Sequence, residues 1–155
     1  LFDMAGRVAL VTGASSGLGA RFAKVLAANG AAVALVARRA DRLGMVKAEI
    51  EAAGGRAVAI EADVLDRAAM ARAFDAAEQA FGTVTVLVNN AGIARGGRAV
   101  ELAPEQWREV IATNLDAVFL WSQEASRRML AAQAKGAIIN ISSPQGKQGK
   151  LLRGP

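Results

Sequence analysis

The apolar residues of the chain fall into short blocks that alternate with stretches of helical spacing. Five blocks are nearly continuous runs of Val, Ile, Leu and Ala, and we predict them as β-strands: Arg7–Thr12, Ala32–Ala37, Arg56–Glu61, Val84–Asn89 and Ala137–Ser142. Continuous apolarity is typical of strands that are buried on both faces of a parallel sheet. We therefore expect these blocks to form the centre of the molecule.

The segments between the blocks have the periodicity and boundary residues of helices. We predict helices over Gly17–Asn29, Asp41–Ala53 and Asp66–Phe81, and a longer helix or helix pair from about Pro104 to about Ala134. Asp41 and Asp66 are expected N-caps, and Pro104 suits a first helical turn, where its missing N–H costs nothing. Strands that alternate with helices of this length indicate an α/β fold, a Rossmann-type doubly wound parallel sheet of five strands.

The chain reads as one domain. No linker or repeat interrupts residues 1–143, and the Gly/Lys/Gln-rich residues 144–155 are predicted to be a loop. With 53% hydrophobic residues and a mean hydropathy of +0.25, the 155 residues can bury a core, which excludes intrinsic disorder. No apolar run approaches the roughly 18 residues of a membrane helix, and no leader is apparent, so we expect a soluble, cytoplasmic protein.

Composition excludes several classes of chemistry. The sequence contains no Cys, no His and no Tyr. Disulfides, thiolate metal sites and Ser-His-Asp catalysis are therefore impossible within it, and we predict no metal site. The net charge of +5 favours nucleic acid, but the 19 basic residues are scattered among 14 acids and aromatics are only 5%. We read this charge as solvated helix faces, with nucleic-acid binding as the least favoured alternative.

A glycine-rich loop, Thr12–Gly19, follows the first strand and opens the first helix. Glycines there permit a tight turn and let backbone N–H groups approach a pyrophosphate, and the helix N-terminus adds a positive dipole end. The spacing is G-x-x-x-G-x-G rather than the common G-x-G-x-x-G, and a glycine turn without a ligand is the alternative. The predicted dinucleotide-binding residues of this loop are Gly13, Ser15, Ser16, Gly17, Leu18 and Gly19.

Two further motifs follow the fourth and fifth strands, Asn89-Asn90-Ala91-Gly92 and Asn140-Ile141-Ser142-Ser143. Together with the glycine loop, and in this order, they make the chain from about residue 3 to residue 143 resemble the short-chain dehydrogenase/reductase family. The resemblance implies the strand order 3-2-1-4-5, followed in the family by two further strands. It also implies NAD(H)- or NADP(H)-dependent oxidation of alcohols or reduction of ketones.

The residues after the second strand bear on which cofactor binds. Ala37 stands where NAD-binding sites usually present an acid, and Arg38 and Arg39 follow. A guanidinium can pair with a 2′-phosphate, so NADP(H) is favoured over NAD(H). The second basic mark of the NADP-preferring subgroup is absent, because Ser16 precedes Gly17, and solvated surface arginines are the alternative.

Other cofactor contacts are implied only by the resemblance. Asp63 and Val64 match the pair that flanks the adenine ring, although Asp63 could also be an ordinary loop residue. Asn90, Ala91 and Gly92 match the turn that lines the adenosine ribose. This turn ends the fourth strand beside the first, at the switch point where a doubly wound sheet opens its ligand crevice.

The resemblance also implies catalytic roles for two residues. Asn114 matches the Asn that anchors a proton-relay water, and Ser143 matches the Ser that orients the substrate oxygen, with Ser142 as the alternative. Asn114 is flanked by the apolar Ile111 and Leu115, so we expect a buried amide that needs hydrogen-bond partners. A helix-bending structural Asn is the alternative.

The family's Tyr-x-x-x-Lys motif is expected about 13 residues after the Ser, near position 156. The chain has 155 residues and no Tyr. We therefore expect a fragment, the NADP(H)-binding part of a short-chain oxidoreductase acting on small alcohols or ketones, inactive as given. We expect the complete protein to be a homo-oligomer, a dimer or tetramer, with no nucleic-acid or membrane partner. The alternative is a non-enzymatic dinucleotide-binding or interaction module.

Overall fold

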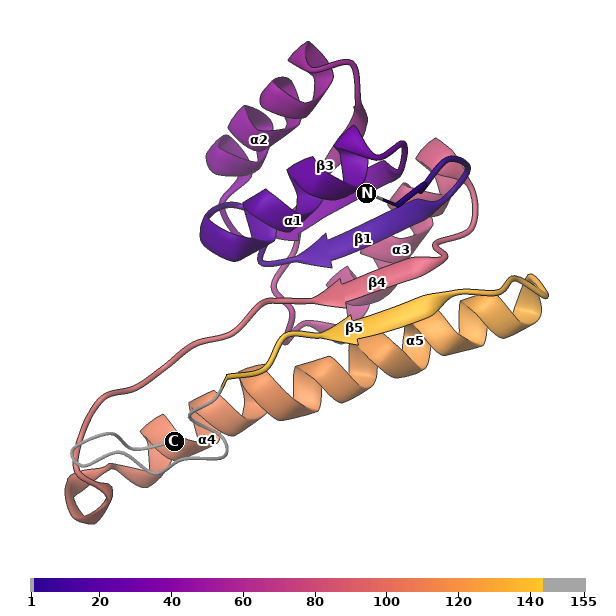
Figure 1. Cartoon of the computed structure of the whole chain (residues 1–155). Coiled ribbons are helices and arrows are strands. Elements are labelled where there is room, and N and C mark those ends of the chain that lie inside the picture. The colour runs from indigo at the N-terminus through magenta and orange to yellow at the C-terminus, as the bar shows by residue number, and fades with distance from the viewer. Residues whose placement is uncertain (1, 144–155) are drawn as a thin grey trace.

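A computed structural model describes residues 2–143, which form a five-stranded parallel sheet with helices on both faces (Figure 1). The strands are β1 (Val8–Thr12), β2 (Ala32–Ala37), β3 (Arg56–Glu61), β4 (Val86–Asn89) and β5 (Ala137–Asn140). Their order is β3-β2-β1-β4-β5, and every neighbouring pair is parallel. The predicted fold class and strand order are confirmed. The predicted loop 144–155 lies outside the described residues.

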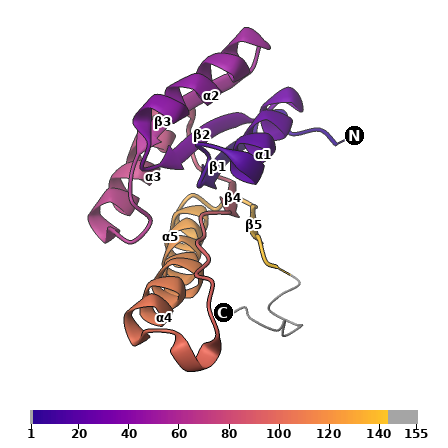
Figure 2. The same cartoon turned by 90° about the vertical axis from the view of Figure 1, so that its left-hand side faces the viewer.

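The helices form two layers. Helices α1 (Gly17–Ala28) and α2 (Ala40–Ala52) pack on one face of the sheet, and α3 (Arg67–Phe81) and α5 (Ala117–Ala131) pack on the other (Figure 2). A short 3₁₀ turn (Ala99–Glu101) precedes α4 (Pro104–Ile111). A π-helical turn (Ala112–Asp116) then joins α4 to α5 in one continuous helix. No helix within residues 2–143 is long and apolar enough to cross a membrane.

The two predicted N-cap residues, Asp41 and Asp66, can be compared with the observed starts of α2 and α3. Asp66 is the N-cap of α3, and its carboxylate accepts the N–H groups of Ala69 and Ala68, which lower the pKa of Asp66. The N-cap predicted at Asp41 is wrong. Helix α2 begins at Ala40, because the carbonyl of Arg39 accepts its first N–H bond, and Asp41 lies in the first turn, where the dipole favours an acid.

The C-terminal end of α5 also differs from the prediction. The helix ends at Ala131 rather than near Ala134. Gln133 adopts φ of 52°, and the N–H of Ala134 donates to the carbonyl of Met129, which closes the helix three residues early. Nothing in the apolar spacing reports such a backbone turn.

The edge strands depart from the expectation of burial on both faces. In β5, Ile138 packs against the core under α3 and α5, but Ile139 is 44% exposed and Ile141, just beyond the strand, is 38% exposed. The expectation is wrong here because none of the helices in residues 2–143 packs on that face of β5 (Figure 2). Apolarity predicted the strand, and the neighbouring elements determine its burial.

A charged cluster joins α5 to α3. The guanidinium of Arg128 donates to Glu124 at 2.8 Å and Glu78 at 2.7 Å, pairs with Asp75 at 2.8 Å, and lies 5.3 Å from the ring centre of Phe74. Burial alone would lower the pKa of Arg128, but its hydrogen bonds to the three carboxylates outweigh burial and raise it. The layer of α3 and α5 is thus held by ionic as well as apolar contacts.

Candidate functional site

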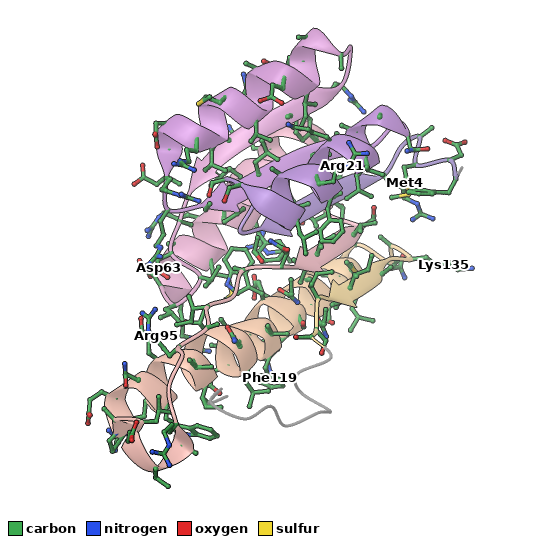
Figure 3. The ribbon with its side chains drawn as sticks, turned by 60° about the vertical axis from the view of Figure 1, so that its left-hand side comes forward. Met4, Arg21, Asp63, Arg95, Phe119 and Lys135 are labelled. Carbon is green, nitrogen blue, oxygen red and sulfur yellow. The ribbon has the colours of Figure 1, made fainter. Side chains whose placement is uncertain are left out.

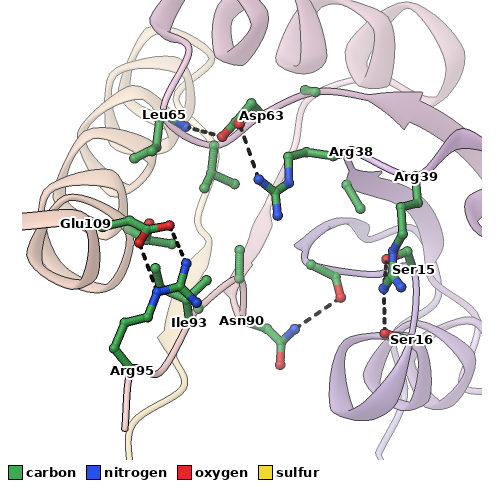
Figure 4. A pocket seen from close by; sticks show the side chains of 17 residues that line it. Ser15, Ser16, Arg38, Arg39, Asp63, Leu65, Asn90, Ile93, Arg95 and Glu109 are labelled. Atoms are coloured by element: carbon green, nitrogen blue, oxygen red, sulfur yellow. Dashed lines mark hydrogen bonds and ion pairs between the residues drawn. The ribbon is translucent and has the colours of Figure 1, made fainter. Parts of the chain in front are cut away.

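A cleft of about 520 Å³ opens at the carboxyl ends of the central strands (Figure 4). The residues that line it are Gly13, Ser15, Ser16, Ala37, Arg38, Arg39, Ala62, Asp63, Val64, Leu65, Asn90, Ala91, Gly92, Ile93, Arg95, Glu109 and Thr113. Ala37 is the last residue of β2, and the others follow β1, β2, β3 and β4 or belong to the α4–α5 helix. This is the switch point of the sheet, where strand order reverses and doubly wound folds bind ligands.

The glycine loop forms one wall and depends on missing side chains. Gly13 has φ of 66°, and a Cβ built there would lie 2.9 Å from Ala91 Cα. A Cβ on Gly19 would lie 2.3 Å from the Gly13 carbonyl oxygen and 2.5 Å from Asn90 Nδ2. Both contacts are too short for any side chain, so these glycines allow the loop to pack closely on the turn after β4.

Thr12 and Asn90 hold the glycine loop to that turn. The buried Thr12 Oγ1 accepts the N–H groups of Asn90 and Ala91, both at 3.1 Å. The amide Nδ2 of Asn90 donates to the carbonyls of Thr12 at 3.1 Å and Gly13 at 3.3 Å. The predicted Asn90 is therefore a scaffold residue that shapes the cleft. Thr12 belongs to the same network, although the sequence analysis gave it no role.

The two arginines after β2 differ in their contacts. Arg39 Nη2 donates to Ser15 Oγ and to Ser16 Oγ, each at 2.9 Å. Arg38 is 74% exposed and lies 3.8 Å from a carboxylate oxygen of Asp63 across the cleft. Arg39 is therefore the arginine held beside the glycine loop, whereas the Arg38 side chain is largely exposed to solvent.

The start of α1 suits an anion. Its N-cap, Ser16, makes no side-chain hydrogen bond to the helix backbone, so the first-turn N–H groups keep their capacity to bind a ligand. The Arg39 guanidinium and the hydroxyls of Ser15 and Ser16 lie beside this helix end. Backbone donors at this helix end and the positive charge of Arg39 together fit the phosphates of a dinucleotide. Within residues 2–143, no group of three or more acidic residues could hold a metal ion.

A second ion pair forms the opposite end of the cleft. Arg95, in the loop after β4, makes a bidentate pair with Glu109 of α4, with N–O distances of 2.9 and 2.6 Å. Asp63 and Arg95 lie at the same end of the sheet, opposite Met4 and Lys135 (Figure 3). No sequence pattern predicted this pair, because its members are 14 residues apart across an aperiodic loop. The buried Thr113 also lines the cleft and was not predicted, although it is next to Asn114 in the same motif.

Asn114 is not the buried amide that we expected. It is exposed, because the π-helical turn carries it towards the loop after β4. Its side chain still has partners: Oδ1 accepts the N–H of Ile93 at 2.9 Å, and Nδ2 donates to the Ile93 carbonyl at 2.8 Å. Ser142 and Ser143 are exposed after β5. None of these three candidates lines the cleft.

Most of the predicted cofactor residues do line it. Ten of the thirteen are found there, and the three that are not are Gly17, Leu18 and Gly19. Gly19 is buried under the loop, where its missing Cβ allows the packing described above, whereas Gly17 and Leu18 are exposed at the first turn of α1.

Known proteins share this arrangement. The family profile described as short chain dehydrogenase matches residues 7–154. A relative from Streptomyces violaceoruber, named as a ketoacyl reductase of granaticin polyketide synthase, is 46% identical over 143 residues, which are 92% of this chain and 53% of that protein. D-threitol dehydrogenase from Mycolicibacterium smegmatis is 40% identical over 142 residues, 92% of this chain and 54% of that enzyme.

A solved structure gives the same result in three dimensions. A short-chain type dehydrogenase/reductase from Mycobacterium marinum superposes with a TM-score of 0.94 at 35% identity, covering 99% of this chain and 62% of that one. The chain spans about half the length of the curated relatives it matches. On fold, motifs and relatives together, the chain belongs to the short-chain dehydrogenase/reductase family.

Proposed function

We propose that this chain is the NADP(H)-binding part of a short-chain oxidoreductase that interconverts small alcohols and ketones. The observation that carries the proposal is the Arg39 guanidinium held on Ser15 and Ser16 beside the start of α1. Relatives named as a ketoacyl reductase and a D-threitol dehydrogenase support the substrate class. A bound nicotinamide cofactor would supply the hydride that this chemistry needs.

The chain's own residues would divide the cofactor between them. The N–H groups at the start of α1, with Gly13, would bind the pyrophosphate, and Arg38 and Arg39 would bind the 2′-phosphate. Asp63 and Val64 would flank the adenine. The turn Asn90–Gly92 would line the adenosine ribose, held in place by Thr12.

The remaining chemistry would involve Ser143 and Asn114. Ser143 would orient the substrate oxygen after β5. The Asn114 side chain is occupied by Ile93, so a relay role would fall to the backbone of the π-helical turn, where hydrogen bonding departs from the α-helical pattern. The acid/base would come from outside these 155 residues, which lack Tyr and His, in a longer protein that we propose is a homo-oligomer.

The alternative is a dinucleotide-binding module that acts on a partner without catalysis. NADPH-dependent partner binding without turnover, in the longest natural form of the protein, would favour this alternative.

Cofactor titration followed by nicotinamide fluorescence tests the proposal. We expect NADPH to bind at least about tenfold more tightly than NADH, because charged hydrogen bonds contribute roughly 1.5–3 kcal/mol. Arg38→Asp should reverse the order, and Arg39→Ala should weaken the binding of NADPH more than that of NADH. Arg21→Asp, a charge change on the exposed face of α1 away from the cleft, is the matched control. Equal binding of the two cofactors by the wild type would contradict the NADP(H) assignment.

A further inference from the structure

Trp121 on α5 reaches from the core to the wall of the cleft. It is the largest fully buried side chain of residues 2–143, with 1% of its surface exposed. Its indole Nε1–H donates to the backbone carbonyl of Val64 at 3.0 Å. A buried indole N–H without a partner costs free energy, so this hydrogen bond fixes the distance between α5 and the loop after β3.

That loop is a compact turn with other ties to the molecule: the N–H of Ala62 donates to the carbonyl of Ala37 at 3.0 Å, Arg38 lies 3.8 Å from Asp63, and Val64 packs against the core. The carboxylate of Asp63 accepts the N–H of Leu65 at 3.0 Å, and the Asp63 carbonyl accepts the N–H of Asp66 at 3.1 Å. These bonds hold the turn's internal shape. They do not set where the turn stands relative to the cleft, which Asp63, Val64 and Leu65 line. The bond from Trp121 to Val64 ties the middle of the turn to α5 across the core.

The same continuous helix also fixes the opposite wall. Thr113 lines the cleft, Asn114 binds both backbone groups of Ile93, and Glu109 pairs with Arg95. One rigid element therefore holds the loop after β4 near its start and the loop after β3 near Trp121. The separation of the two walls follows from the geometry of this helix.

We propose that Trp121 is a positioning residue for the adenosine end of the dinucleotide: through the Val64 carbonyl it places Asp63 and Val64 against the adenine. The inference rests on the proposed cofactor role of this cleft and extends it to a residue that touches no ligand. Trp121 has two roles in this proposal: its ring packs in the core, and its N–H holds the loop after β3 in place.

Two substitutions separate these two roles. Trp121→Phe removes the N–H and part of the ring. Phe74→Leu is the matched control, because Phe74 packs against the same indole, with ring centres 5.6 Å apart, and leaves the bond to Val64 intact. Both variants should lower the melting temperature, as any truncation in this core would.

Amide hydrogen exchange and ligand affinity then report on the position of the loop after β3. In Trp121→Phe we expect the amide hydrogens of Leu65 and Asp66 to exchange about tenfold faster. We also expect the affinity for adenosine 2′,5′-bisphosphate, which has an adenine but no nicotinamide, to fall about five- to tenfold. In Phe74→Leu both values should stay within about twofold of the wild type. Equal exchange rates and affinities in the two variants would overturn the inference.

Residue analogues keep the test decisive if Trp121→Phe fails to fold. In a Trp107→Phe background, Trp121 is replaced by 3-benzothienylalanine, which keeps the bicyclic ring and lacks the N–H, or by 5-fluorotryptophan, which keeps both. The first should show the faster exchange and the second should restore wild-type exchange. If the wild type binds neither adenosine 2′,5′-bisphosphate nor NADPH, the proposed function fails, and the exchange measurements still decide the role of Trp121.

Discussion

Strands β2 and β5 have similar apolar sequences and opposite surroundings. All six residues of β2 are buried, whereas β5 contains no fully buried residue. Both strands have hydrogen-bonded neighbours, but β2 has two and lies between helical layers, whereas β5 has one among residues 2–143. The difference shows that a strand's own apolarity does not determine how far it is buried, because burial also needs helices on both faces.

The contrast extends to function. The residues that line the cleft come from the carboxyl end of β2, from the segments after β1, β2, β3 and β4 and from the α4–α5 helix, and none of them follows β5. The catalytic candidate Ser143 comes after β5, on the less buried side of the molecule. Under the proposed function, cofactor binding and catalysis would therefore depend on differently supported parts of the sheet, and four predictions test this.

The largest expected effect concerns turnover. We expect the 155-residue chain to bind NADPH and to show no dehydrogenase activity with any alcohol or ketone. An acid/base residue typically contributes about 10²–10⁴-fold, and the chain has neither Tyr nor His for that role. The check is NADPH oxidation by the purified chain against a protein-free control. Turnover above the control would contradict the separation of binding from catalysis.

The next largest effect concerns the glycine loop, which lies in the part of the sheet that has helices on both faces. Gly19→Ala should destabilise the protein by about 3 kcal/mol, because the new Cβ would meet the Gly13 carbonyl oxygen at 2.3 Å. Gly44→Ala is the control, since a Cβ at Gly44, inside α2, meets nothing within 4 Å. It should stabilise by about 0.5–1 kcal/mol through helix propensity. Urea unfolding of both variants measures the difference. A mild effect at Gly19 would mean that the loop can yield.

A smaller effect tests how the α3–α5 layer is held. Arg128→Ala should cost about 2 kcal/mol, because it leaves Glu78 and Glu124 without their half-buried partner. Arg127→Ala removes a neighbouring, 66% exposed arginine that lies 3.8 Å from Glu124, and should cost less than about 0.5 kcal/mol. Thermal unfolding compares the two. Similar melting temperatures would show that apolar packing alone holds the layer.

The smallest effect on stability concerns the open face of β5. We expect the chain to self-associate through its exposed apolar residues, and Ile139→Lys with Ile141→Lys to reduce this. The change in unfolding free energy should stay within about 0.5 kcal/mol, as is usual for exposed sites. Light scattering at several concentrations measures association, and Ile138→Lys, which charges the opposite, packed face, should unfold the chain. A monodisperse wild-type monomer would contradict the expected association.

Local sequence signals predicted much of the fold. The apolar blocks located all five strands to within two residues, and the N-cap at Asp66 is confirmed. The N-cap predicted at Asp41 is wrong because Asp is favourable both at an N-cap and in the first helical turn, and Asp41 lies two positions after the N-cap Arg39. The burial of β5 could not be read from its residues, because it depends on which helices lie over them.

In the candidate site, too, local motifs were predictive and long-range contacts were not. The three motifs brought ten of thirteen cofactor candidates to one cleft, since motif residues follow parallel strands whose carboxyl ends meet. The pair Arg95–Glu109 and the bond from Trp121 to Val64 join residues that are 14 and 57 positions apart. No local periodicity marks such contacts. They exist because the α4–α5 helix crosses both loops.

The π-helical turn Ala112–Asp116 sets the rotational phase of that helix. A π turn contains one residue more than an α-helical turn, and one residue corresponds to about 100° of rotation. Side chains before the turn and after it therefore follow two helical wheels that are offset from each other. Deleting one residue from the turn would give the whole helix one α-helical phase. If Glu109 still faced Arg95, Trp121 would then be rotated away from Val64. The extra residue allows one helix to contact the loop after β4 through Glu109 and the loop after β3 through Trp121.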